Sequence, residues 1–197
     1  KLAWFAFAAV MGQALLGGLT VLNMLPMAIS VAHACLAQTF FCLVIALAYF
    51  LRPHADQKPI ARSGLAAESQ PLLKRLCILT TSFIYLQLFL GAIIRHSSFT
   101  VIPHIGVAFL ILLHVILVLV RTLRFHGNQI FPVRLSIGLG VLAVVQVFLG
   151  MGSFIFKRLL ASGYAPSTEQ VVFTAAHQTT GALVLGTSFL LTLVVWK

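Results

Sequence analysis

Charged side chains are scarce in this sequence, and acidic side chains are the scarcest. Of the 197 residues only 8% are charged and three are Asp or Glu, whereas 60% are hydrophobic. A soluble domain carries roughly 25% charged residues, so these few charges cannot cover a surface that faces water. The composition therefore excludes a soluble domain and indicates an integral membrane protein.

Cysteine is also rare, and the basic residues do not form a patch. Cys35, Cys42 and Cys77 lie within apolar runs or at their edges, so we expect small buried side chains and no external disulfide. The 13 Lys and Arg residues are scattered between the apolar runs. Nucleic-acid binding needs basic residues gathered on one face, and this scatter argues against a nucleic-acid partner.

Long apolar runs are what the sequence has in abundance. A helix needs roughly 20 apolar residues to cross a bilayer, and the runs lack the alternation of a membrane β-barrel. Pro, Gly, Asn and Ser residues separate them. The sequence therefore predicts an all-α fold, a polytopic membrane bundle with six transmembrane helices. The predicted spans are about 2–22, 28–51, 76–94, 101–120, 135–156 and 170–196.

The distribution of Lys and Arg predicts the orientation of these spans. Positive residues accumulate on the cytoplasmic side of a membrane protein. With the N-terminus inside, ten of the 13 basic residues lie on the inner side. The three on the outer side are Arg95, Lys157 and Arg158. We therefore expect an N-in/C-in topology.

A short motif recurs three times and predicts three repeated helical hairpins. Each odd-numbered span contains Gln-x-x-Leu-Gly, and the next span carries a histidine near its start. The motifs are 13–17, 87–91 and 146–150, and the histidines are His33, His104 and His177. We divide the chain accordingly into a two-helix remnant of a first half-bundle (1–52), a cytoplasmic linker (53–75) and a four-helix half-bundle (76–197).

Three explanations compete for these histidines, because a histidine within a membrane span costs free energy unless it is satisfied. It can be structural, it can relay protons, or it can ligate haem iron. The three acids, Asp56, Glu68 and Glu169, lie in loops or at a helix boundary, so a carboxylate relay within the spans is excluded. Paired histidines on facing helices of a bundle are typical of axial haem ligands, and we favour that interpretation.

Two of the histidines fall within one complete four-helix set. We expect His104 and His177 to be the axial ligands of one haem b, beside Gly91 and Gly150, whose lack of a side chain lets a flat cofactor approach the backbone. His33 has no equivalent partner and is a candidate ligand of a second haem.

Four residues at the predicted outer surface are candidates to bind haem propionates. Arg95 and His96 follow the third span, and Lys157 and Arg158 follow the fifth. Snorkelling at the membrane interface explains them equally well. His114 lies about 15 Å deeper than His104 and on another side of the helix, so we expect it to be structural. His54 and His126 are expected in cytoplasmic loops without a special role.

Several segments resemble haem A synthases along nearly the whole chain. Residues 13–22 with His33 resemble the third and fourth helices of that family. Residues 90–96 with His104 are similar to its fifth and sixth helices, and the segments 146–150 and 176–181, which include His177, resemble its seventh and eighth. The resemblance implies that His104 and His177 hold haem b, and that His33 belongs to a half where haem O is oxidised to haem A.

The resemblance leaves more than one function open. The first two helices of the family, with their histidine and catalytic acid, have no counterpart here, so no catalytic residue is assigned. The alternatives are a non-catalytic haem b subunit for electron transfer or scaffolding in a larger respiratory complex, and a transporter-like or structural subunit. Expected partners are the lipid bilayer, haem, and other membrane subunits or a second copy. The expected location is the bacterial cytoplasmic or mitochondrial inner membrane.

Overall fold

The regular structure is entirely helical in the part of the chain that the computed structural model describes, residues 1–52, 65–97, 101–160 and 165–196. Within these ranges, six helices are long and apolar enough to cross a membrane, which confirms the predicted all-α membrane bundle. The elements are α1 (Leu2–Leu22), α2 (Met27–Phe50), α3 (Leu65–Ile94), α4 (Val101–His126), α5 (Ile130–Phe154), η3 (Ile155–Leu159, a π-helical turn) and α6 (Thr168–Trp196).

Proline residues mark where several of these helices begin. Pro26 precedes α2, and Pro103 and Pro132 lie in the first turns of α4 and α5. Proline is tolerated there because the first N–H groups of a helix have no acceptor within the helix. The turn between α1 and α2 holds Met24 and Leu25 at φ values of 57° and 61°, and Leu25 N–H closes the end of α1 on the carbonyl of Thr20 at 2.8 Å.

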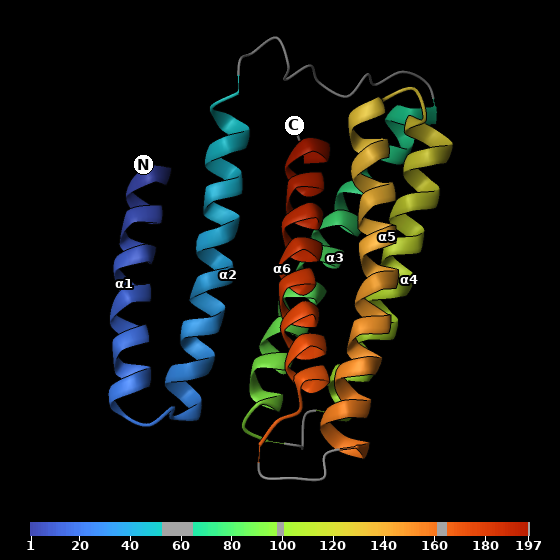
Figure 1. Cartoon of the computed structure of the whole chain (residues 1–197). Helices are drawn as coiled ribbons and strands as arrows, with labels where there is room; N and C mark the ends of the chain where they lie inside the picture. Colours follow the sequence, from blue (N-terminus) through green and yellow to red (C-terminus); the bar gives the residue numbers. More distant parts are fainter. Residues whose placement is uncertain (53–64, 98–100, 161–164, 197) are drawn as a thin grey trace.

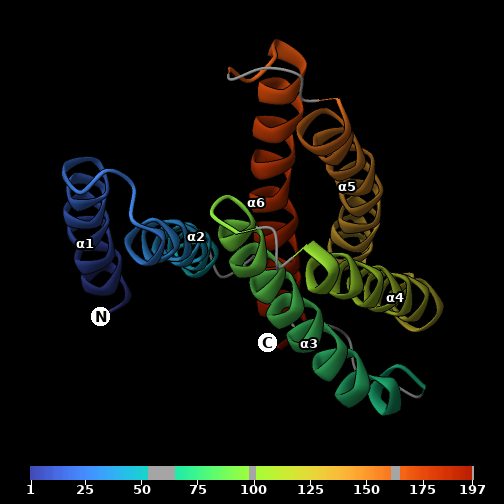
Figure 2. The same cartoon turned by 90° about the horizontal axis from the view of Figure 1, so that it is seen from below.

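Helices α3 to α6 form a closed ring in which each helix packs against two neighbours. The packed pairs are α3 with α4, α4 with α5, α5 with α6, and α6 with α3. Seen along the bundle, α4 and α6 occupy diagonal positions (Figure 2). The hairpin of α1 and α2 lies beside this ring. Within the described residues α2 packs against α3 and α6, and α1 packs against α2 alone.

Most of the core lies inside the ring of α3 to α6, and Tyr49 of α2 packs onto it. Its most deeply buried side chains include Leu139 of α5 and Leu185 of α6, which are 1% and 0% exposed. Polar side chains are tolerated there because their hydroxyls bond to carbonyls of their own helix, as Thr122 does to Val118 at 2.7 Å. In lipid every backbone polar group must be satisfied internally, and continuous helices meet that requirement.

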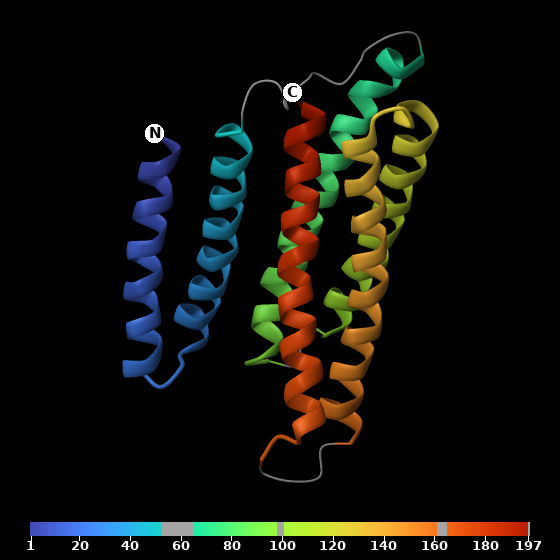
Figure 3. The same ribbon diagram turned by 45° about the horizontal axis from the view of Figure 1, so that its top comes forward.

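Both termini lie at one end of the molecule, which we call the termini end (Figures 1 and 3). The turn between α1 and α2 and the starts of α4 and α6 lie at the opposite end. Two features of the termini end differ from expectation. Helix α3 begins at Leu65, well before the predicted span. Helix α4 continues through His126, which is 2% exposed and lies 3.3 Å from the Ser69 hydroxyl. The prediction of a loop position for His126 was wrong, because packing against α3 buries it.

Candidate functional site

His33, His104 and His177 lie near the starts of α2, α4 and α6. They are therefore at the end of the molecule opposite the termini end. Each ring packs against a glycine of the preceding helix. A Cβ atom added to Gly17 would lie 3.1 Å from His33 Cε1, and one added to Gly91 would lie 3.3 Å from His104 Cε1. At Gly150 the distance to His177 Cε1 would be 2.8 Å. Any side chain at these positions would therefore push on the imidazole, most strongly at Gly150.

The glutamine of each motif lies one helical turn before the glycine, so both residues share the helix face that meets the histidine. Gln87 Nε2 donates to the backbone carbonyl of His104 at 2.9 Å. Gln146 Nε2 donates to the carbonyl of His177 at 3.0 Å. These bonds fix the histidine-bearing turn against the preceding helix. The motif is evident in the sequence, whereas the bond from each of these glutamines to a histidine carbonyl is evident only in the structure.

His104 and His177 face each other across the diagonal of the four-helix ring. Their ring centroids lie 6.4 Å apart with an angle of 66° between the ring planes. His177 Nδ1 lies 3.2 Å from the backbone carbonyl of Gln146, a contact that requires a proton on Nδ1 and leaves Nε2 as the nitrogen with a lone pair. His104 Nδ1 is buried and has no hydrogen-bond partner among the described residues.

This separation suits two imidazoles on opposite sides of one metal ion. An imidazole nitrogen binds a transition metal at about 2 Å and lies about 1 Å from its ring centroid, so two such rings have centroids roughly 6 Å apart. A direct hydrogen bond between the rings would bring their nitrogens within about 3 Å of each other. No bond between His104 and His177 occurs in the described structure. The pair is therefore spaced for a shared ligand and not for mutual bonding.

The histidine pair supplies two ligands and no more. Across the described residues, no three His, Cys, Asp or Glu side chains come together to hold a metal ion. A bare ion takes four or more ligands, whereas haem iron already has four from its porphyrin and needs only axial ligands from the protein. The donor set of this site therefore fits haem better than a bare metal ion.

His33 differs from the other two histidines in what its ring contacts. Its Nε2 lies 3.2 Å from Gln13 Nε2, whereas His104 and His177 meet their glutamines through the main chain. Its Nδ1 is buried without a partner in the described chain. The structure brings His104 and His177 together but places His33 in the separate hairpin of α1 and α2. No described residue supplies His33 with a facing histidine.

The predicted propionate-binding residues follow α3 and α5 at the end of the molecule opposite the termini. Arg95 and His96 are exposed on the turn after α3, and Lys157 is half-buried in η3. The side chain of Arg158 lies outside the described residues. Their proposed role stays a prediction.

His114 has the contacts of a structural residue. Its Nδ1 lies 2.8 Å from the carbonyl of Leu110 one turn earlier in the same helix, and its ring meets Phe83 edge-on at 5.0 Å. Both contacts agree with the predicted structural role and separate His114 from the pair.

No protein-family model, curated protein or solved structure matches this chain. The resemblance to haem A synthases stays a prediction.

Proposed function

We propose that this chain is a haem b-binding integral membrane protein of the haem A synthase type, with His104 and His177 as the axial ligands. The observation that carries this proposal is the diagonal histidine pair. Its ring centroids are 6.4 Å apart, and each Nε2 lacks a hydrogen-bond partner among the described residues. A ring nitrogen left without a partner within a membrane span is costly, and an iron ion bound by the Nε2 atoms of both rings would satisfy that nitrogen on each ring.

The surrounding residues orient the two ligands. The Gln146 carbonyl accepts a hydrogen bond from His177 Nδ1, and such a bond sets the tautomer and orientation of a metal-bound histidine. Gly91 and Gly150 let the rings lie against α3 and α5, and the glutamine bonds hold the backbone of each histidine. A haem held by both histidines would supply one-electron transfer.

The charge distribution supports placing this haem near the outer surface. An N-in/C-in orientation puts ten of the 13 basic residues on the cytoplasmic side. The histidine pair, at the end opposite the termini, then lies near the outer face. We propose that Arg95, His96, Lys157 and Arg158 bind the propionates at that face. The membrane is a bacterial cytoplasmic or mitochondrial inner membrane.

The resemblance implies that the activity is oxidation of haem O to haem A. His33 would then belong to the half of the protein that binds the substrate haem O. One observation favours the second candidate, a non-catalytic haem b subunit for electron transfer or scaffolding. The His33 Nε2 faces Gln13, and within the described residues it has no histidine partner. A second haem site at His33 therefore needs a ligand from elsewhere.

The test of haem b binding is a reduced-minus-oxidised absorption spectrum of the purified protein. We expect the band of a low-spin b-type haem in the wild type and its loss in H104A and in H177A. His114→Ala is the matched control, because it removes a histidine of α4 that bonds to its own helix. Circular dichroism checks that all variants remain helical. A wild type without haem, or retention of haem in H104A, contradicts the proposal.

A separate assay distinguishes the two candidate functions. Membranes that carry the protein are supplied with haem O, a reductant and oxygen, and the extracted haem is analysed by mass spectrometry. Formation of haem A that H33A abolishes supports the synthase function. A haem b band without haem A formation supports the electron-transfer or scaffold subunit.

A further inference from the structure

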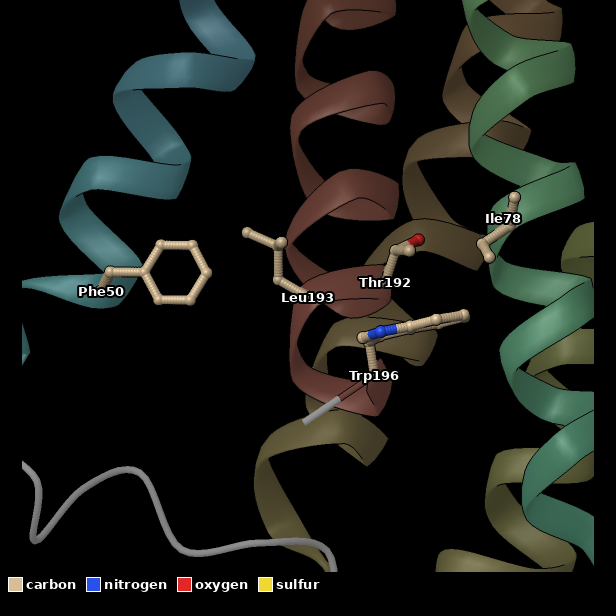
Figure 4. Close-up of a pocket in the computed structure, with 5 residues that line it drawn as sticks. All are labelled: Phe50, Ile78, Thr192, Leu193 and Trp196. Carbon is tan, nitrogen blue, oxygen red and sulfur yellow. The ribbon is translucent and has the colours of Figure 1, made fainter. Parts of the chain in front are cut away.

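Two cavities follow each other along the seam between α2 and the four-helix ring. The first, with a volume of about 310 Å³, opens between the end of α2, α3 and the end of α6. Its lining, drawn in Figure 4, consists of Phe50, Ile78, Thr192, Leu193 and Trp196. The second, of about 290 Å³, lies farther from the termini end between the same three helices, and Cys42, Tyr85 and Phe189 are among its lining residues.

The two cavities lie one after the other and outline a narrow path along the seam. Apolar side chains dominate the first cavity, and the hydroxyl-bearing residues Thr39, Thr81, Ser82 and Tyr85 also line the second. Between Leu185 in the second cavity and Trp196 in the first, helix α6 rises about 16 Å at 1.5 Å per residue. An α-helix with its side chains is about 10–12 Å wide. Cavities at the lower end of the ligand-pocket range, roughly 300 Å³, are too small for such a helix. Their length and width suit one acyl chain.

A cationic side chain, Lys74, stands at the termini end of this path. Lys74 of α3 places its ammonium nitrogen 5.0 Å from the centre of the Trp196 ring and donates to the Trp196 carbonyl at 3.0 Å. These are its contacts within the described chain, and neither partner is a carboxylate. Arg52 follows the end of α2, with its guanidinium over the Phe131 ring at 5.2 Å. Trp and Lys at such a position are typical of the membrane interface.

We propose that this seam is a binding site for an anionic phospholipid. One acyl chain lies in the two cavities, and the phosphate and headgroup bind Lys74. Basic pockets between transmembrane helices on the cytoplasmic side bind anionic headgroups, and the positive charge at the mouth favours such a lipid over an uncharged one. An isoprenoid quinone would fill the same path but carries no charge for Lys74.

The position of the site gives the lipid a structural consequence. Helix α2 is the only part of the α1–α2 hairpin that packs on the ring within the described residues, and the cavities lie along that contact. A chain bound there fills the space between α2 and α6. We therefore expect anionic lipid to stabilise the attachment of the hairpin.

The test compares lipid binding to the purified protein by native mass spectrometry and by thermal unfolding. We expect phosphatidylglycerol to bind more tightly than phosphatidylcholine and to raise the unfolding temperature more. Lys74→Gln keeps a hydrogen-bond donor for the Trp196 carbonyl but loses the charge. One interfacial charge accounts for a roughly five-fold change in affinity, so we expect a loss of that size for phosphatidylglycerol, and retention in K74R.

Arg75→Gln is the matched control, because Arg75 is the next residue of α3, is exposed and lines neither cavity. Ile78→Trp, which fills the first cavity, should reduce binding of both lipids while helicity is retained. Equal binding of the two lipids, an equal loss in R75Q, or displacement of the lipid by a stoichiometric isoprenoid quinone would overturn the proposal.

Discussion

The hairpin of α1 and α2 and the ring of α3 to α6 use the same local design in different surroundings. In both, a glutamine and a glycine one turn apart meet a histidine of the next helix. In the ring two hairpins close on each other, and 44% of the α6 span is buried. In α1 only 6% of the span is buried, and Trp4, Phe5 and Leu15 are exposed.

The difference separates what one hairpin can build from what two can build. One hairpin holds a histidine against a glycine, as His33 lies against Gly17. The facing pair of His104 and His177 arises only where two hairpins meet across a diagonal. The α1–α2 hairpin therefore presents half of such a site, and variants at matched positions can test how far the two regions differ.

The largest effect, on haem binding, is expected from a bulky side chain at Gly150, where the His177 ring packs against the backbone of α5. In Gly150→Leu the new side chain would displace His177, whose Cε1 lies 2.8 Å from the first added atom. We expect haem occupancy, measured as the b-type band per protein, to fall more than about ten-fold, because a ligand displaced by 1 Å loses its bonding geometry. Gly17→Leu makes the same change beside His33 and should leave the band intact. Equal losses in both variants would contradict the comparison.

The next largest effect, on the free energy of unfolding, is expected from truncating a buried leucine of the ring and is compared with truncating an exposed leucine of α1. Leu185 is 0% exposed in the ring, whereas Leu15 of α1 is 65% exposed. Leu→Ala in a packed core costs about 2–5 kcal/mol. In lipid the transfer contribution is small, so we expect about 2 kcal/mol for L185A, at the lower end of that range. L15A should change the free energy of unfolding by less than about 0.5 kcal/mol. Unfolding in mixed micelles by a denaturing detergent measures both.

A smaller effect is expected from the glutamines. Gln146→Ala removes the bond to the His177 carbonyl but leaves the Gln146 backbone carbonyl that faces His177 Nδ1. A hydrogen bond between helices in a membrane contributes about 1 kcal/mol, so we expect haem affinity to fall a few-fold with the absorption band unchanged in position. Gln13→Ala should not change haem b affinity at all. Haem titration of the apoprotein gives both values.

The sequence predicted the spans well because the bilayer imposes a length and a composition that can be read residue by residue. It also drew attention to His104 and His177, because a histidine in an apolar run is conspicuous, and the structure places Gly91 and Gly150 against their rings. Their meeting across the ring depends on which helices are diagonal, and spacing along the chain does not specify that. The assignment to haem stays a prediction.

Residues near the termini end were harder to interpret from the sequence. His126 follows a basic segment and was expected in a loop, yet packing of α4 on α3 buries it beside Ser69. Lys74 was counted only as a topology signal, because its contact with Trp196 joins residues 122 positions apart. Composition shows that such residues lie near the membrane surface, but it does not show which end of which helix they contact.

The smallest effect, a coupling energy between two side chains, is expected where α2 of the hairpin contacts α3 of the ring. The Tyr85 hydroxyl of α3 lies 2.8 Å from the Thr39 hydroxyl of α2 and donates to the Cys35 carbonyl at 3.1 Å. Such bonds average about 0.6 kcal/mol in membrane double-mutant cycles, since the separated helices find other partners. We expect Y85F and T39V to show a coupling energy of that size in unfolding measurements. Ser82→Ala, on the same helix and lining the same cavity, is the control and should show no coupling to Thr39. A coupling above about 2 kcal/mol, beyond the largest value of those cycles, would mean that the hairpin is held as firmly as the ring itself.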